Sequence, residues 1–336
     1  MALGEQSERL VHCSPGYWNP TAVELAERLK EITGMDHVFL GCTGAEANEC
    51  AIKLARKWGR ARKGGAFRLV ATWKGFHGRT LATMAATGKP EWQGLFGPSC
   101  DGFDHVPFGD LEAMERALGT ETCAVMLEPV QGEGGVNVAD AAYLRGVREL
   151  CDRRGILLIA DEVQTGLGRC GDWLACDALG TRPDIVTLGK GLGGGVPVSA
   201  CATRTEIDCF EPGDQGGTFT YHPLGSAVAL AVLDAIRDRA LLAAARERGA
   251  QVERILESLA PEYGLRDIRG LGLLRAFDLP APKAAALVEA ARERGLLLNA
   301  PKPSTIRLFP ALTVSGEEVE EFGVRIAAAL ADVAGR

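Results

Sequence analysis

The chain has 336 residues, 46% of them hydrophobic, with 37 Lys and Arg against 44 Asp and Glu. This length and apolar content are typical of a globular protein with a large buried core and room for a second, smaller unit. The net charge of −7 at pH 7, with no basic cluster longer than residues 60–63, argues against a nucleic-acid-binding surface.

Two further classes of protein are disfavoured by the residue pattern. No apolar run approaches the length of a membrane span and the N-terminus lacks an apolar leader, so we expect a cytoplasmic protein that binds no membrane. The ten cysteines are dispersed without C-x-x-C spacing, and the five histidines share no ligand spacing. We therefore expect reduced thiols, mostly in the core, and no metal site.

The first clear pattern along the chain is an amphipathic helix over residues 21–33, ended by Gly34. A short apolar run at 37–42 then leads through Thr43-Gly44-Ala45 into a second helix over 46–58. A strand that turns into a helix in this way directs unpaired backbone N–H groups and the positive end of the helix dipole at one point. The segment therefore predicts either an anion site or an ordinary helix cap at Thr43.

The next strand candidate, residues 67–73, ends in the sequence KGFHGR. Phe76 between glycines can lie against a planar ligand while Arg79 binds a carboxylate, although a surface turn with an exposed arginine explains the same residues. Residues 85–110 are rich in Gly, Pro and aromatic residues, and we expect them to be irregular.

Three more apolar runs end in charged residues beside glycine. Residues 123–127 stop before Glu128-Pro129 and the segment containing Glu133, and a helix over 141–153 follows. The runs 156–160 and 184–188 stop at Asp161 and at Gly189-Lys190. Helices between strands indicate an α/β fold with a mostly parallel sheet, whose carboxyl ends share one edge. We expect ligand-binding side chains to converge there, namely Thr43, Arg79, Glu133, Asp161 and Lys190.

The last third of the chain predicts a smaller α+β unit. Residues 216–220 form a tight loop whose hydroxyls suit a phosphate, and a helix over 225–239 follows. Beyond it, helical stretches alternate with short strands at 272–279, 296–298 and 306–308, and Arg307 in the last strand needs a partner if it is buried. The predicted division is an N-terminal segment and helix (1–33), a large domain (34–239) and a small C-terminal α+β domain (240–336).

The convergent residues point to one cofactor. A P-loop ATPase is excluded because no G-x-x-x-x-G-K-[ST] motif is present. The G-x-G-x-x-G match at 166–171 begins after its strand has ended, which argues against a dinucleotide-binding enzyme. A lysine that can form a Schiff base with an aldehyde, an acid for a pyridine nitrogen, a helix N-terminus for a phosphate and an aromatic ring together meet the needs of pyridoxal 5′-phosphate.

Residues 19–333 resemble the class III pyridoxal-phosphate aminotransferases of fold type I, in particular the acetylornithine and ornithine aminotransferase branch. The stretches that carry the resemblance are TGAEANECAIKLAR (43–56), FHGRTLATMAATG (76–88), EPVQGEGGV (128–136), IADEVQTGLGRCG (159–171), PDIVTLGKGLGGGVPVSA (183–200) and GTFTYHPLG (217–225). The resemblance implies a mostly parallel central sheet with helices on both faces, and a homodimer whose subunits share active sites.

The resemblance also implies roles for individual residues. Lys190 would be the Schiff-base lysine and proton carrier, and Asp161 would pair with the pyridine nitrogen. Gln164 would contact the ring hydroxyl, and Phe76 would stack on the ring. Gly44 and Ala45 would bind the phosphate, which Thr218 of the partner subunit would also reach. The implied substrate-binding residues are Arg307, for the α-carboxylate of glutamate or 2-oxoglutarate, Glu133 as its counter-ion, and Arg79 for a second carboxylate.

The sequence departs from the family pattern at three places. The family has a further N-terminal segment before the stretch matching residues 16–20, so we expect a short form or a truncated start. Thr220-Tyr221-His222 replaces the usual Gly-Gly-Asn, and Arg275 stands where a small or apolar residue is common. We expect transfer of an amino group from an ω-amine donor, such as N-acetylornithine or ornithine, to 2-oxoglutarate. A decarboxylase or aminomutase of the same fold, or a catalytically weak cofactor-binding protein, are the alternatives.

Overall fold

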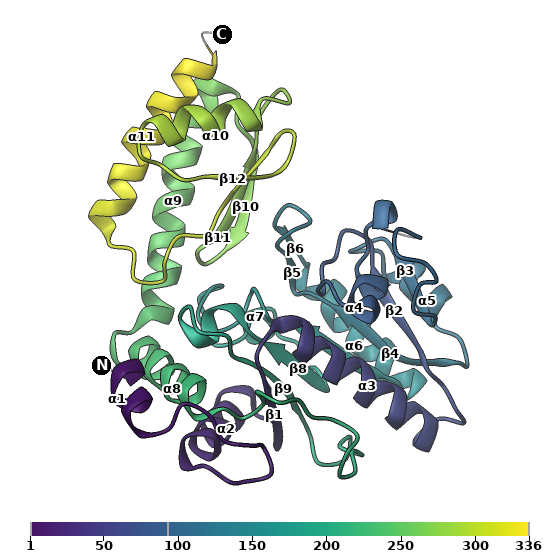
Figure 1. Ribbon diagram of the computed structural model, residues 1–336. Helices are drawn as coiled ribbons and strands as arrows, with labels where there is room; N and C mark the ends of the chain where they lie inside the picture. The colour runs from purple at the N-terminus through teal and green to yellow at the C-terminus, as the bar shows by residue number, and fades with distance from the viewer. Residues whose placement is uncertain (1, 93, 335–336) are drawn as a thin grey trace.

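The computed structural model describes residues 2–92 and 94–334, and its larger part is built on one sheet (Figure 1). Within the described residues this sheet has seven strands, in the order β1 (His37–Gly41), β9 (Ser199–Thr203), β8 (Ile185–Leu188), β7 (Leu157–Asp161), β4 (Thr122–Leu127), β2 (Arg68–Thr72) and β3 (Phe103–Val106). Only β9 runs against its neighbours, so the predicted mostly parallel sheet is confirmed.

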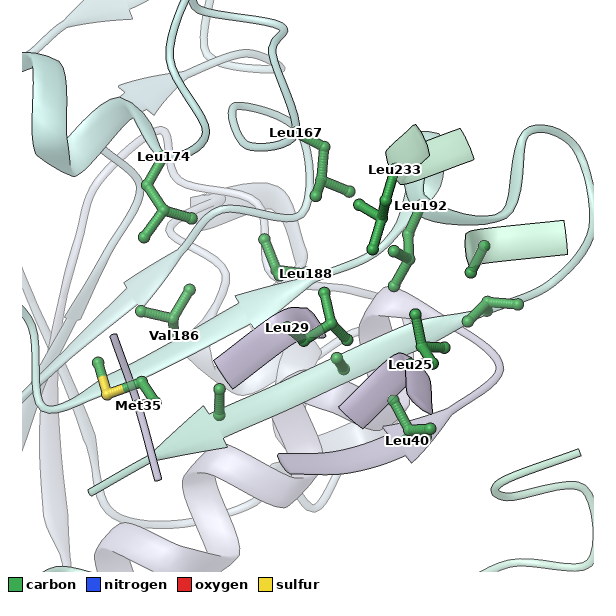
Figure 2. Close-up of a cluster of buried hydrophobic side chains, with 14 of the residues drawn as sticks. Leu25, Leu29, Met35, Leu40, Leu167, Leu174, Val186, Leu188, Leu192 and Leu233 are labelled. Carbon is green, nitrogen blue, oxygen red and sulfur yellow. The ribbon is translucent and has the colours of Figure 1, made fainter. Parts of the chain in front are cut away.

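Helices cover both faces of this sheet, as expected of the α/β fold. Every residue of β4 and β7 is buried, and successive residues point to opposite layers. Ala160 faces a cluster shared with α2 (Pro20–Thr33) and α8 (Pro223–Asp238), whereas Ile159 faces the cluster of α3 (Gly44–Arg62). Figure 2 shows Leu25 and Leu29 of α2 in the first of these clusters with Leu188 of β8.

Further helices and several short elements complete this larger part. A second cluster on the α2 and α8 face is formed by α5 (Leu111–Ala117) and α6 (Ala141–Arg154). The other elements are α1 (Ala2–Arg9), α4 (Leu81–Ala86), the 3-10 helices η1 (Pro90–Trp92) and η2 (Lys190–Gly193), α7 (Ala175–Ala178), and a hairpin of β5 (Val130–Gln131) and β6 (Asn137–Val138).

The C-terminal part has its own antiparallel sheet and its own core (Figure 1, upper part). Its strands lie in the order β10 (Arg266–Leu271), β11 (Leu274–Asp278), β13 (Thr305–Leu308) and β12 (Asn299–Lys302). One face is covered by α9 (Leu241–Tyr263), α10 (Ala284–Glu293) and α11 (Gly316–Ala334). The predicted boundary at residue 240 falls between α8 and α9. The three-part division stays a prediction, and its residues 1, 93, 335 and 336 lie outside the described residues.

Several sequence-based expectations about local structure are wrong. Residues 85–110, expected to be irregular, contain β3, an edge strand whose first three residues are only half-buried and include Asp104 and His105. Residues 296–298, expected to form a strand, precede β12 without regular structure, and Leu297 is exposed. The strands β9 and β10 and the helix α1 were not predicted. Neither β3 nor β10 has the apolar run on which strand prediction depends.

Residues 2–92 and 94–334 include no helix that is both long and apolar enough to cross a lipid bilayer.

Candidate active site

Three chain segments meet in direct contact at the carboxyl edge of the large sheet. If Gly44, the first residue of α3, carried a Cβ atom, that atom would lie only 2.6 Å from Cγ1 of Val163, just after β7. A Cβ on Gly189, after β8, would lie 3.4 Å from the Cα of Gly44. Lys190 follows with φ of 43°, a left-handed conformation that non-glycine residues adopt rarely and at an energetic cost. The backbone therefore presents Lys190 and the start of α3 to the same place.

The first turn of α3 has free backbone donors. Thr43 and Glu46 form a capping box, in which Thr43 Oγ1 accepts from the Glu46 N–H at 3.2 Å and Glu46 Oε2 accepts from the Thr43 N–H at 2.7 Å. Within the described residues, the N–H groups of Gly44 and Ala45 have no acceptor. With the helix dipole, these two groups form a place for an anion, so the cap and the anion site coexist.

Asp161, the last residue of β7, is buried and held by three donors. Its Oδ2 accepts from Asn48 Nδ2 at 2.7 Å and from His77 Nδ1 at 2.8 Å. Its Oδ1 accepts from the Val163 N–H at 3.0 Å, and Thr187 Oγ1 lies 3.4 Å from the same oxygen. A carboxylate whose two oxygens are both fixed is a rigid partner for a cationic group that binds opposite it.

Burial disfavours the charged form of His77, but the hydrogen bond and charge of Asp161, helped by Glu128, outweigh it and raise the pKa of His77. Asn48, His77 and Thr187 were not predicted as site residues. His77 stands inside the FHGR motif, where only Phe76 and Arg79 were assigned, and Asn48 lies one helical turn after Gly44. Both residues lie close in sequence to assigned site residues, but their contacts with Asp161 cross 113 and 84 residues and have no local signal.

Lys190 is the first residue of η2 and is exposed at the edge of the sheet. Desolvation by the surrounding protein lowers the pKa of its amine, while the charges of Asp161, Glu128 and Glu133 oppose the change. A larger fraction of the amine is therefore unprotonated than in a free lysine. An unprotonated amine is the form that attacks a carbonyl or accepts a proton.

Phe76 and Arg79 lie beside Trp92. The guanidinium carbon of Arg79 is 5.0 Å from the ring centre of Trp92 and 5.9 Å from that of Phe76. Lys89 shares this arrangement, with its amine 4.7 Å from the Trp92 ring centre and 5.4 Å from that of Phe76. Neither cation forms an ion pair with a carboxylate of residues 2–92 or 94–334, so both are available to an anionic ligand. Lys89 was not predicted.

The β5–β6 hairpin brings Glu133 to the smaller sheet. Its Gly135 carbonyl accepts from Arg269 Nη2 at 2.7 Å and Nε at 3.0 Å, which fastens the hairpin to β10. Glu133 Oε1 then lies 2.7 Å from Nη1 of Arg307, which is buried on β13. Burial tends to raise the pKa of Glu133, but Arg307 outweighs it and the pKa is lowered. The buried Arg307 thus has the partner that it needs.

The last two predicted site residues are Gln164 and Thr218. Gln164 packs so closely on the hairpin that a Cβ on Gly132 would overlap its Oε1 at 1.4 Å, and the same oxygen is 3.5 Å from Nη1 of Arg307. Thr218 is exposed in the loop between β9 and α8. The carbonyl of its neighbour Phe219 accepts from Cys42 Sγ at 3.4 Å, which puts this loop beside the entrance to α3.

Comparison with known proteins decides the family. A sequence model described as aminotransferase class-III matches residues 1–330. The chain belongs to the class III aminotransferase family. This aminotransferase is 48% identical to acetylornithine aminotransferase 2 of Bordetella parapertussis over 317 residues, which cover 94% of this chain and 80% of the relative. It is 46% identical to acetylornithine aminotransferase of Ralstonia nicotianae, over 95% of this chain and 82% of the relative.

Solved structures agree with this assignment. An ornithine aminotransferase of Toxoplasma gondii, with pyridoxal 5′-phosphate at its active site, matches with a TM-score of 0.94 at 35% identity, over 99% of this chain and 82% of that chain. An acetylornithine aminotransferase of Elizabethkingia anophelis matches with a TM-score of 0.86 at 33% identity, over 98% and 83%. The chain is a transaminase that depends on pyridoxal 5′-phosphate and acts on an amino donor and a 2-oxo acid.

The residues at the sheet edge fit this cofactor. The two free N–H groups at the start of α3 suit a phosphate, and the tight contact of Gly44 with Val163 leaves no room there for a side chain. Asp161 is a buried acceptor for a protonated ring nitrogen, and Lys190 is an amine with a lowered pKa for an aldehyde. The roles of individual residues stay predictions.

A second buried carboxyl group, Glu128, gives a prediction about pH. Its Oε1 accepts from the Phe76 N–H at 2.8 Å, and burial, with Asp161, raises its pKa from 4.5 to about 7 although the charge of His77 opposes this. Because the folded-state pKa is the higher one, ionisation of Glu128 lowers the free energy of unfolding as the pH rises from 4.5 to about 7. Glu128→Gln removes that loss.

We therefore expect the free energy of unfolding of Glu128→Gln, relative to wild type, to rise by about 2–3 kcal/mol between pH 5 and pH 8. Urea unfolding of the cofactor-free chain at both pH values measures the difference. Glu149→Gln, on the exposed side of α6, serves as the control and should show a change close to zero. The prediction is contradicted if the free energy of unfolding of Glu128→Gln, relative to wild type, is the same at both pH values.

Proposed function

We propose that this aminotransferase transfers an amino group from an ω-amine donor, N-acetylornithine or ornithine, to 2-oxoglutarate in two half-reactions. The observation that carries the proposal is the Glu133–Arg307 ion pair at 2.7 Å, together with Arg79, which forms no ion pair with a carboxylate of the described residues. Two arginines suit a dicarboxylic oxo acid, and a displaceable counter-ion suits a donor that lacks the second carboxylate. Relatives named acetylornithine aminotransferase, at 48% and 46% identity, support this choice.

The cofactor would be held at the carboxyl edge of the large sheet. The N–H groups of Gly44 and Ala45 would bind its phosphate and Phe76 would lie against its ring. Asp161 would hold the proton on the ring nitrogen, and Gln164 would contact the ring hydroxyl. Lys190 would bind the aldehyde covalently. Bound in this way, pyridoxal 5′-phosphate supplies an electron sink for the carbon that carries the amino group.

Lys190 would then move the proton of the reaction. Its amine would lie beside the substrate carbon that loses the amino group. Its lowered pKa keeps more of the amine in the proton-accepting form, so it would take a proton from that carbon and return it elsewhere. The carboxylate of Asp161, held by Asn48 and His77, would face the nitrogen of the ring.

Glu133 and Arg307 would let one pocket accept two kinds of substrate. With 2-oxoglutarate or glutamate bound, Arg307 would pair with the α-carboxylate and Glu133 would withdraw. With an ω-amine donor bound, Glu133 would return and neutralise Arg307 at 2.7 Å, as in the structure. This neutralisation matters because a buried arginine without a counter-ion raises the free energy of the folded protein by several kcal/mol.

We expect Arg307→Gln to raise the KM for 2-oxoglutarate about 100-fold, since a charge-assisted contact worth about 2–3 kcal/mol is lost. The half-reaction with N-acetylornithine should stay within about threefold of wild type, because Arg307 is neutralised in that half. Stopped-flow absorbance of the bound cofactor measures the halves separately. An equal loss in both halves would argue that Arg307 serves the fold rather than the oxo acid.

The proposed reaction is tested by titrating the holoenzyme with a panel of ω-amino acids, with and without 2-oxoglutarate. We expect N-acetylornithine or ornithine to change the absorbance of the bound cofactor in one turnover, and sustained reaction only with the oxo acid. Turnover without the oxo acid would indicate a decarboxylase or aminomutase. Cofactor binding with no absorbance change for any donor would indicate a catalytically weak protein.

The proposal includes a cytoplasmic homodimer with shared active sites. It is supported by the exposure of Thr218 and Phe219 beside the start of α3, where a second subunit would meet the phosphate site. Light scattering of the purified holoenzyme should give twice the mass of the 35.6 kDa chain. A monomer that retains full activity contradicts this part of the proposal.

A further inference from the structure

Asn48 connects the elements that surround the cofactor site. It lies on α3, one turn after Gly44, and is almost completely buried. Its Nδ2 donates to Asp161 Oδ2 at 2.7 Å and to the carbonyl oxygen of His77, also at 2.7 Å. One amide group therefore links α3 to the end of β7 and to the loop that carries Phe76.

Thr187 fixes the direction of this amide. Its Oγ1, on β8, donates to Asn48 Oδ1 at 2.7 Å, so the amide nitrogen must face the two acceptors on the other side. Every polar atom of the Asn48 side chain is thus used. A buried amide with all of its bonds made has one stable position, and the residues bonded to it are held with it.

The first turn of α3 also packs directly against the loop that carries Phe76. A Cβ on Gly78, where φ is 138°, would lie 2.9 Å from Cβ of Ala45 and 2.6 Å from Thr83 Oγ1. The loop therefore rests directly on the first turn of α3. A small shift of that turn must displace either the loop or the amide of Asn48, since neither contact leaves a gap.

We propose that Asn48 is a positioning residue, oriented by Thr187, that makes binding of phosphate at the first turn of α3 order the carboxylate of Asp161 and the loop of Phe76. The inference rests on the proposed placement of the cofactor phosphate at Gly44 and Ala45. It assigns Asn48 no contact with substrate. Its consequence is that the phosphate end of the site prepares the ring end before chemistry begins.

The test uses the full-length chain with its cofactor removed and inorganic phosphate as the probe, followed by hydrogen exchange. In wild type, phosphate should slow exchange at least threefold in three places, namely residues 42–46, residues 76–78 and the Val163 N–H that donates to Asp161. In Asn48→Ala, protection should remain at 42–46, weaken at 76–78, where Gly78 still packs on Ala45, and vanish at Val163. Thr187→Val should behave like Asn48→Ala, and Thr187→Ser, which keeps the hydroxyl, like wild type.

Kinetics of the reconstituted holoenzymes give a second measurement. Asn48→Ala and Thr187→Val should lower kcat about tenfold and weaken cofactor binding about tenfold, while the KM of the amino donor stays within about threefold. Thr187→Ser should restore kcat. The inference is overturned if phosphate still protects residues 76–78 and Val163 in Thr187→Val as strongly as in wild type. Wild type without protection at 42–46 would overturn the phosphate placement and, with it, the inference.

Discussion

Replacing Lys190 with alanine should lower the rate of transamination by about 10,000-fold or more. The variant loses both the amine that binds the cofactor aldehyde and the base that moves the proton, and a positioned base alone contributes about 100- to 10,000-fold. Single-turnover absorbance with N-acetylornithine measures the loss.

Lys302→Ala is the matched control for this variant. Lys302 is also a lysine whose pKa is lowered by desolvation, but it lies on β12 of the smaller sheet. Its replacement should leave the rate within about threefold of wild type. If Lys190→Ala retains more than about one hundredth of the wild-type rate, the role assigned to Lys190 is wrong.

The second large effect is expected for Asp161→Asn, with kcat lowered about 1,000-fold. The amide has nearly the same shape but carries no charge, so it cannot hold a proton on the ring nitrogen. It also removes the charge that outweighs burial at His77, and the pKa of His77 should fall below that of wild type. Kinetics and an NMR titration of His77 measure the two effects.

Asp177→Asn, on the short helix α7, is the control for Asp161→Asn, because its carboxyl group is outside the site. It should change neither kcat nor the titration of His77 by a measurable amount. If Asp161→Asn lowers the pKa of His77 without lowering kcat, Asp161 organises the fold around His77 and does not act on the ring.

The strands that the sequence predicts are those buried on both faces. Residues 123–127 and 156–160 form continuous apolar runs because both faces of β4 and β7 are covered by helices. β3 lies at the edge of the sheet and is only partly covered, so its sequence FDHV carries polar residues and no such run. An apolar run in the sequence therefore indicates that a strand is buried on both faces, and strands that are only partly buried lack this signal.

The residues of the site likewise fall into those that the sequence can predict and those that it cannot. Asp161 and Lys190 can be found from sequence because each ends an apolar run, and parallel strands place those ends at one edge. Asn48 and His77 contact Asp161 across separations of 113 and 84 residues, and Glu128 approaches the same cluster through the Phe76 N–H. No local spacing encodes these contacts, since they depend on how α3 and the loop before α4 pack against the sheet.

The central claim, that Lys190 is the residue joined to the cofactor, is tested most directly by reducing the holoenzyme with borohydride and mapping the product by mass spectrometry. Reduction makes the bond between lysine and cofactor permanent, so the labelled peptide identifies the lysine. We predict one cofactor mass on the peptide that contains Lys190, and none in Lys190→Ala treated in the same way. A label on Lys302 or any other lysine of the wild-type chain, with Lys190 unmodified, would contradict the account.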